Sequence, residues 1–370
     1  MNPLILSLLT ASAMTAAANS SFVYVGSYTK GPEEGISLLK MDDETGTLEN
    51  LGFVAAAPNP TFLALDPKGE HLYAIHERQP GSVAAYKIDR TTGKLTLLNT
   101  EKTSGNGPCH VSVCRDGKNL LVANYGSGSV ACLPIRADGS LAPHSAFVQH
   151  TGHSVDKDRQ KEPHAHGIYQ SPGGKFVLAC DLGTDKVYVY RFDPARGSLE
   201  PNDPPAGDLK PGAGPRHAAF STDGKRLYVI NELDCTVTVF SWDEAKGVLQ
   251  AIESVSTLKE PVDGNSTAEV EVHPGNARVL YGSNRGANTI VRFSVDPDTG
   301  KLTYQDETST TGPAPRHFAT HPNGKWMLAG NQNAETLVSY KVDSATGKLS
   351  QHGQPLPLRS PVCMVFLPRK

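Results

Sequence analysis

Apolar and polar residues alternate along most of the chain in short runs that are typical of β-strands. One type of run includes PTFLALDPKG, PCHVSVCRDG and PRHAAFSTDG, and each leads through a glycine-centred turn into a more apolar run such as HLYAIHE, NLLVANY or RLYVINE. A third alternating run follows, for example SVAAYKID or TVTVFSWD, and a second glycine turn leads to a fourth. No convincing helical period interrupts this order, so the pattern predicts units of four short antiparallel strands.

The four-strand unit is repeated seven times. The glycine of a (T/D/K/R)-G-x-L turn marks each copy, at spacings of 46 to 58 residues: Gly46, Gly93, Gly139, Gly197, Gly247, Gly300 and Gly347. The chain starts with FVYVGSY, which matches a second strand, and finishes with PVCMVFLP, which matches a first strand. We therefore predict an all-β fold, a seven-bladed β-propeller with four antiparallel strands per blade, formed by one domain over residues 20–370. Its last blade is expected to contain both ends of the chain, which closes the ring and removes its open edges.

Composition narrows the class of protein further. The 370 residues are 38% hydrophobic and include 35 Gly and 27 Pro, which fits many short strands and tight turns. The formal net charge is −3 and no basic stripe occurs, so binding to nucleic acid is not expected. The six cysteines form no C-x-x-C pair, which disfavours a zinc ribbon or a redox motif and predicts buried free thiols.

The first eighteen residues have the character of a secretory signal. MNPLILSLLTASAMTAAA is apolar and ends in small residues, although the first lysine of the chain is only Lys30. The segment is too short for a comfortable membrane span, so no membrane partner is expected. We predict a signal peptide over residues 1–18 and export to the periplasm or the medium; without such a signal the protein would be cytoplasmic.

Charged residues recur where the first strand of a unit begins and where the second ends. In PRHAAFSTDGKRLYVINEL, Gly224 lies midway between Arg216 and Glu232, so a hairpin makes these two residues cross-strand neighbours. The same arithmetic pairs Thr61 with Glu77, Cys109 with Tyr125, His166 with Asp181, Ala268 with Arg285, and Arg316 with Gln332. In a propeller these strand ends meet on one rim of the central channel.

This rim is the predicted functional site, because it collects titratable groups in a concavity. The candidate residues are His110, His164, His166, Asp181, Arg216, His217, Glu232, Glu269, Arg285, Arg316, His317 and Gln332. A purely structural interpretation stays open beside this one. The Arg216–Glu232 pair would then tie blades together, and His217 and His317 would be core histidines bonded to nearby backbone.

The residue types at this rim favour acid–base chemistry with an anion clamp. No G-x-S-x-G motif is present, and the GSGS at residues 126–129 precedes a strand, so neither an acyl-enzyme nor a nucleotide loop is expected. Arginines among the candidate ligands disfavour a metal, and no cofactor is expected. Glu232 beside Arg216 should keep a lowered pKa, whereas His166 beside Asp181 would be the better general base. Arginines would stabilise an oxyanion and hold a carboxylate or phosphate.

Several motifs together resemble a known family. GPCHVSV, PHAHG, GPRHAAF, VINEL, SNRGANTI and the T-G-K-L turns are similar to those of the seven-bladed lactonase family, over essentially the whole chain after the N-terminal segment. This family includes the propeller type of 6-phosphogluconolactonase and the fungal carboxy-muconate lactonising enzymes. The resemblance implies catalytic roles for His166, Arg216, Glu232 and Arg285, with His164 as an alternative to His166.

The same resemblance implies the opening of a sugar lactone. The substrate would be 6-phosphogluconolactone or a related aldonolactone, and an exported protein would more plausibly meet an unphosphorylated one. The expected partner is thus a small anionic lactone. Two alternatives remain: a muconate-type cycloisomerase, and a non-catalytic propeller that binds a protein or a glycan.

Overall fold

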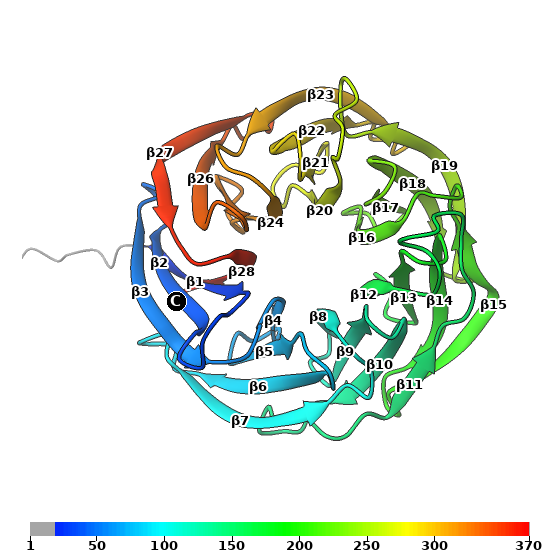
Figure 1. Cartoon of the computed structure of the whole chain (residues 1–370), viewed down its shortest axis with the longest axis horizontal. Coiled ribbons are helices and arrows are strands. Elements are labelled where there is room, and N and C mark those ends of the chain that lie inside the picture. The colour runs from blue at the N-terminus through cyan, green and yellow to red at the C-terminus, as the bar shows by residue number, and fades with distance from the viewer. Residues whose placement is uncertain (1–18, 370) are drawn as a thin grey trace, which may run out of the picture.

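The computed structural model describes residues 19–369 and shows seven four-stranded antiparallel sheets arranged around a central channel (Figure 1). This confirms the predicted all-β, seven-bladed propeller, and no helix occurs between residues 19 and 369. The predicted signal peptide, residues 1–18, lies outside the described residues. Within the described range, no helix long and apolar enough to cross a membrane is found.

Each blade is built in the same order from the channel outwards. The innermost strands are β4 (Leu63–Leu65), β8 (Pro108–Val113), β12 (Ala165–Gln170), β16 (Pro215–Phe220), β20 (Thr267–Val272), β24 (Pro315–Thr320) and β28 (Pro361–Pro368). The second strands are β1 (Ser20–Ser27), β5 (His71–His76), β9 (Asn119–Asn124), β13 (Phe176–Asp181), β17 (Arg226–Asn231), β21 (Val279–Asn284) and β25 (Trp326–Asn331). These two layers place the candidate site.

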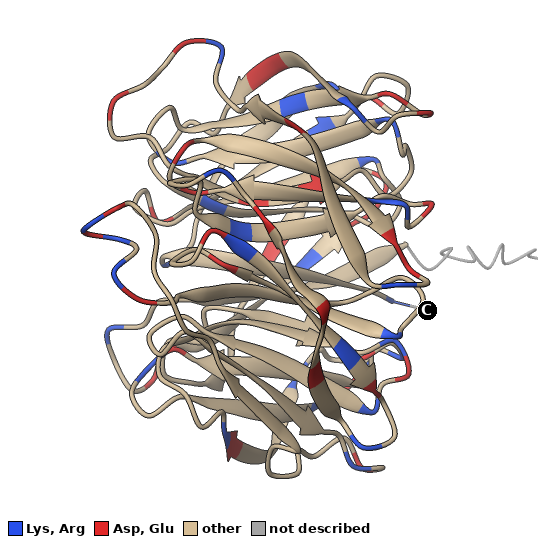
Figure 2. Ribbon diagram, turned by 90° about the vertical axis from the view of Figure 1, so that its right-hand side faces the viewer, with Lys and Arg blue, Asp and Glu red and all other residues tan. Residues whose placement is uncertain are grey.

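The two outer layers complete the blades. The third strands are β2 (Gly35–Asp42), β6 (Ser82–Ile88), β10 (Ser129–Pro134), β14 (Lys186–Asp193), β18 (Thr236–Asp243), β22 (Thr289–Val295) and β26 (Thr336–Val342). The outermost strands are β3 (Leu48–Ala56), β7 (Leu95–Lys102), β11 (Ala146–Gln149), β15 (Ser198–Asp208), β19 (Val248–Ser256), β23 (Leu302–Ser309) and β27 (Leu349–Pro357). Lys and Arg are interspersed with Asp and Glu over the side of the ring in Figure 2, as the modest net charge suggests.

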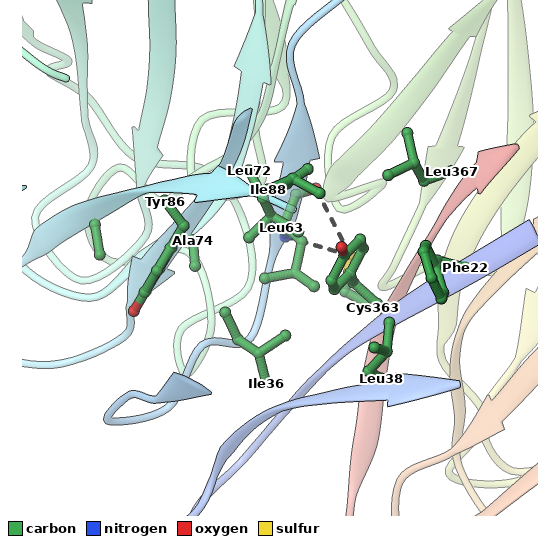
Figure 3. Close-up of a cluster of buried hydrophobic side chains, with 12 residues drawn as sticks. Phe22, Ile36, Leu38, Leu63, Leu72, Ala74, Tyr86, Ile88, Cys363 and Leu367 are labelled. Atoms are coloured by element: carbon green, nitrogen blue, oxygen red, sulfur yellow. Dashed lines mark hydrogen bonds between the residues drawn. The ribbon is translucent and has the colours of Figure 1, made fainter. Parts of the chain in front are cut away.

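The two ends of the chain close the ring, as the sequence predicts. Strand β28 pairs with β1 in antiparallel register, with Tyr24 opposite Val365, so one blade has the order β28-β1-β2-β3. A cluster of buried side chains joins this blade to the next one, and Figure 3 shows Cys363 of β28 beside Leu63 of β4. Burying an aliphatic side chain contributes about 1.5–3 kcal/mol, so such a cluster holds the closing blade without a disulfide. All six cysteines are free, and five of them are buried.

A bulge recurs at the start of the innermost strands. The ladder of β16 with β17 passes from Pro215–Asn231 to His217–Ile230, which leaves Arg216 without a partner. The same skip leaves Cys109, His166 and Arg316 unpaired in β8, β12 and β24. A bulge re-aims the side chain of its extra residue. The predicted cross-strand register of Arg216 and Glu232 is therefore wrong, even though their side chains do meet.

Candidate active site

A cavity of about 340 Å³ opens at one mouth of the channel. Its lining comes from the bulged residues of the innermost strands, from residues that directly follow the second strands, and from two loop residues. The lining residues are Glu77, Cys109, Tyr125, Arg159, His166, Glu232, Ser266, Arg285 and Arg316. The strand ends that the sequence repeat predicts on one rim of the channel therefore do lie together around this cavity.

Glu232 is the centre of a cluster of guanidinium groups. Its Oε1 lies 2.7 Å from Nη2 of Arg159, and its Oε2 lies 2.9 Å from Nη2 of Arg285 and 3.2 Å from Nε of Arg216. The Glu232 side chain is only 6% exposed. Desolvation alone would raise the pKa of Glu232, but the charges of Arg285 and Arg216 and the hydrogen bond from Arg159 lower it to about 2. Glu232 is thus an ionised anchor for arginines and a poor base.

Two of these arginines are also held by the backbone of β20. Arg216 Nη1 donates to the Ala268 carbonyl at 2.8 Å, and Arg285 Nη2 donates to the Thr267 carbonyl at 2.7 Å. The register of β20 with β21 shifts between Thr267 and Val270. This irregularity leaves the two carbonyl groups available, so the guanidinium groups are fixed before any ligand arrives.

Arg316 differs from the other three arginines. In the part of the chain that the structure describes, its guanidinium makes no ion pair and no hydrogen bond, and it lies 5.8 Å from the centre of the Tyr28 ring. Tyr28 itself donates to Glu77 at 3.0 Å, and Glu77 also accepts a hydrogen bond from Thr61 at 2.5 Å. Among the described residues Arg316 is therefore a cation without an ion-pair partner, and it shares the cavity wall with the Glu77 carboxylate.

His166 is the histidine that lines the cavity beside this arginine cluster. It lines the cavity but is only 3% exposed, and its Nδ1 lies 3.7 Å from Cys109 Sγ. Burial, followed by the charge of Arg216, holds the pKa of His166 well below 6.5. Burial likewise raises the pKa of the Cys109 thiol. At neutral pH the cavity therefore offers an unprotonated imidazole and an un-ionised thiol.

The expected contact between His166 and Asp181 is wrong. Asp181 is fully buried inside its blade, where it accepts hydrogen bonds from His150 Nδ1 at 2.6 Å and from the backbone N–H of His164 at 2.9 Å. The ladder pairs Asp181 with Ala165, which makes it the counterpart of Asn231 rather than of Glu232. Because successive residues of a strand face opposite sides, this shift of one residue moves the carboxylate away from the channel.

Four further candidates lie beneath the cavity, outside its lining. His217 Nδ1 is 2.9 Å and His317 Nε2 is 3.6 Å from the same Glu269 carboxylate oxygen. His110 packs on Phe62 at 4.4 Å between ring centres, and its Nδ1 accepts the Ile168 N–H at 3.3 Å. A space of about 10 Å³, the size of one water molecule, separates part of this layer from the cavity.

His164 and Gln332 are also outside the lining. The His164 ring stacks on Tyr125 at 4.4 Å and its Nδ1 lies 2.9 Å from the Tyr125 carbonyl oxygen. Gln332 donates its backbone N–H to Ala314 and makes no contact with Arg316 among the described hydrogen bonds. Of the two candidate bases, His166 is the one that faces the cavity.

Arg159 is the residue that sequence reasoning missed. It belongs to the polar segment DKDRQKEPH, which has no strand pattern. The only signal was the widest repeat spacing, from Gly139 to Gly197, which reveals an insertion in that unit. Ligand-type side chains close enough to hold a metal ion occur in the described chain at Asp66, Glu70 and His71, around the turn from β4 into β5 and outside the cavity lining.

Comparisons with known proteins agree with this architecture. The profile of the family described as "Lactonase, 7-bladed beta-propeller" matches residues 22–366. The 6-phosphogluconolactonase of Bacillus subtilis is 36% identical over 307 residues, which are 83% of this chain and 86% of that protein. The structure of a periplasmic gluconolactonase of Pseudomonas aeruginosa superposes with a TM-score of 0.89 at 33% identity, covering 95% of this chain and all of that one (100%). The chain therefore belongs to the seven-bladed β-propeller lactonase family and is a lactone-hydrolysing carboxylic ester hydrolase.

Proposed function

We propose that this protein hydrolyses a sugar lactone, 6-phosphogluconolactone or a related aldonolactone, in the cavity around Glu232. The observation that carries the proposal is the excess of guanidinium groups there. Arg159, Arg285 and Arg316 line the cavity together with the carboxylates Glu77 and Glu232, and Arg216 contacts Glu232 from outside the lining. Arg316 makes no ion pair with any described residue. Fixed guanidinium groups in a secluded site stabilise negative charge that develops on a carbonyl oxygen.

The reaction that we assign to the site is hydrolysis, which begins with the addition of water to the lactone carbonyl. His166 accepts a proton from a water molecule whose oxygen attacks the lactone carbonyl carbon, and the arginines stabilise the resulting oxyanion. Collapse of this tetrahedral intermediate breaks the bond to the ring oxygen. The proton held by His166 then passes to that oxygen, which leaves a hydroxy acid and an unchanged enzyme. Glu232 takes no proton in this scheme, because its role is to orient Arg216 and Arg285.

We also propose that the protein acts after export. The apolar segment 1–18 with its small-residue end supports this, as does the name of the similar Pseudomonas protein, a periplasmic gluconolactonase. N-terminal sequencing of the protein recovered from the periplasm and the medium tests it. Intact protein starting at Met1 and found only in the cytoplasm would refute export.

The test of the reaction is the hydrolysis of 6-phosphogluconolactone and gluconolactone by the full chain, each measured against the spontaneous rate, with and without EDTA. Replacement Arg316→Met should lower kcat/KM for the accepted substrate by about 100-fold, the usual loss of one oxyanion donor. Arg196→Met, which removes an 83% exposed arginine from a remote turn, is the matched control. Failure of the wild-type protein to accelerate either reaction would contradict the proposed substrates.

A further inference from the structure

The connection between β11 and β12, called the arm below, is an ordered loop that contributes Arg159 to the cavity lining. It spans residues 150–164, whereas the corresponding connections in the neighbouring blades are short, at residues 103–107 and 209–214. A long loop usually needs internal packing to hold one conformation, or else carries a function. This loop has internal packing, because the buried Gln160 fixes its conformation. It also points to a function, because the neighbouring Arg159 lines the cavity.

The anchor is Gln160, which is fully buried. Its Nε2 donates to the Leu182 carbonyl and to Asp185 Oδ1, both at 2.8 Å. Asp185 in turn accepts hydrogen bonds from Ser154 and from the backbone N–H of Gly212 and Gly214, at 2.5, 2.7 and 2.7 Å. Asp185 therefore ties the arm both to its own blade and to the connection at residues 209–214 that leads into the next blade.

Arg159 directly precedes this anchor and projects into the cavity. Its backbone N–H is held by Asp156 Oδ1 at 3.0 Å, so the side chain leaves from a fixed turn. One guanidinium nitrogen, Nη2, makes both of its hydrogen bonds, at 2.7 Å to Glu232 and 3.2 Å to Tyr125. The other nitrogens of the group have no hydrogen-bond partner in the described chain, and the side chain stays 42% exposed.

Neutralisation of Glu232 does not require this third arginine. Arg216 and Arg285 already contact the carboxylate and are far more buried, with 3% and 14% exposure. A rigid arm that adds one more positive charge at the outer edge of the cavity therefore points to a ligand. Guanidinium groups with free N–H donors bind carboxylates and phosphates through paired hydrogen bonds.

We infer that Arg159 is a specificity-determining residue that binds an anionic group, phosphate or carboxylate, at the outer end of the lactone, away from the reacting carbonyl. The inference rests on the proposed function. It divides the cavity into an inner part around His166 and Arg316, where the ring opens, and an outer part at Arg159, where the substrate is selected. Lactones with a distal anion should then be preferred over neutral lactones of the same ring size.

The test compares three substrates with four forms of the full chain. The substrates are 6-phosphogluconolactone, a uronic acid lactone with a free carboxylate, and gluconolactone. The forms are the wild type, Arg159→Gln, Arg159→Lys and Lys161→Gln. Lys161 is 71% exposed in the same arm, outside the cavity lining, so its replacement removes the same charge from the loop without touching the site.

Arg159→Gln should raise KM for the preferred anionic lactone by about 10- to 100-fold, the usual loss of a paired charged hydrogen bond. This loss should exceed the loss on gluconolactone at least about tenfold and should appear in KM rather than in kcat. Arg159→Lys should recover part of the affinity, and Lys161→Gln should behave as the wild type. A loss confined to the phosphorylated substrate identifies phosphate as the group, and a loss confined to the uronic lactone identifies carboxylate.

Two outcomes overturn the inference. Equal losses on all three substrates would mean that Arg159 acts only through Glu232, and no loss on any would mean that it contacts no substrate. If the wild type opens none of the lactones, the proposed substrates fail, but Arg159 can still be judged separately. Calorimetric binding of 6-phosphogluconate and glucuronate to the wild type and to Arg159→Gln, with equal affinities for both, would then overturn the role of Arg159.

Discussion

Glu232 and Asp181 are buried carboxylates at the ends of the second strands of two consecutive blades. Glu232 lies one residue further along its strand than the position that corresponds to Asp181, and the two carboxylates have different hydrogen-bond partners. Asp181 is the last residue of β13 and receives hydrogen bonds from His150 and from the backbone N–H of His164, Gly183 and Thr184. Glu232 follows the last residue of β17, and within the described residues its carboxylate contacts three guanidinium groups. One carboxylate stabilises a blade, and the other organises a cavity.

The difference shows what distinguishes a functional charge from a structural one in this repeat. The partners of Asp181 are the His150 imidazole and backbone N–H groups of its own blade and the adjoining loop, so the carboxylate is satisfied without any ligand. The partners of Glu232 come from β16, from the end of β21 and from the 150–164 arm, and together they carry more charge than the carboxylate neutralises. Such an imbalance costs free energy when buried, and it is reduced when an anion binds.

The largest expected effect separates two histidines that belong to these two regions. His166→Ala should lower kcat by about 100- to 10,000-fold, the usual contribution of a general base, with little change in stability. His150→Ala should leave kcat of the folded protein nearly unchanged but lower the free energy of unfolding by about 3 kcal/mol, because Asp181 and the Tyr190 hydroxyl lose a buried partner.

Steady-state kinetics and urea unfolding of both variants check this contrast. A His150→Ala protein that is as stable as the wild type, or a His166→Ala protein with full activity, would break the distinction between the two regions.

A second effect concerns the pH dependence of stability. The pKa of Glu232 is lowered from 4.5 to about 2 in the folded protein, so its contribution is complete above pH 4.5 and is lost as the pH falls towards 2. Two and a half pKa units correspond to about 3 kcal/mol. Glu232→Gln should therefore be about 3 kcal/mol less stable than the wild type at pH 7, and the gap should shrink below pH 4.5.

Urea unfolding of the two proteins at pH 7, 5, 4 and 3 measures this gap. A constant difference across the series would mean that the guanidinium groups do not hold the Glu232 carboxylate ionised.

The fold could be predicted because the same pattern of apolar and polar residues occurs in every blade. Seven copies of one alternating pattern specify four strands, and the partial units at the two ends specify how β28 pairs with β1. The gathering of Arg216, Glu232, Arg285 and His166 at one rim follows from the same periodicity. The family resemblance, which marks the same four residues, agrees with it.

Three features of the site did not follow from periodicity. The bulge that isolates Arg216 and His166 depends on local backbone geometry, so hairpin counting misplaced Asp181 by one residue. The burial of His217 and His317 against Glu269 depends on how the channel is filled by Phe62. Arg159 lies in an insertion, and its approach to Glu232 is a tertiary contact across 73 residues that no local pattern encodes.

The smallest expected effect tests whether the base is desolvated. A histidine with an ordinary pKa of about 6.5 loses roughly three quarters of its neutral form at pH 6, so an enzyme that relied on it would slow about fourfold between pH 8 and pH 6. Burial and the charge of Arg216 keep the pKa of His166 well below 6.5, and Glu232 is ionised throughout this range. After subtraction of the spontaneous rate, kcat/KM should therefore change less than about twofold between these pH values. A fourfold fall would instead indicate a base with an ordinary pKa, and it would contradict the assignment of the buried His166 as the general base.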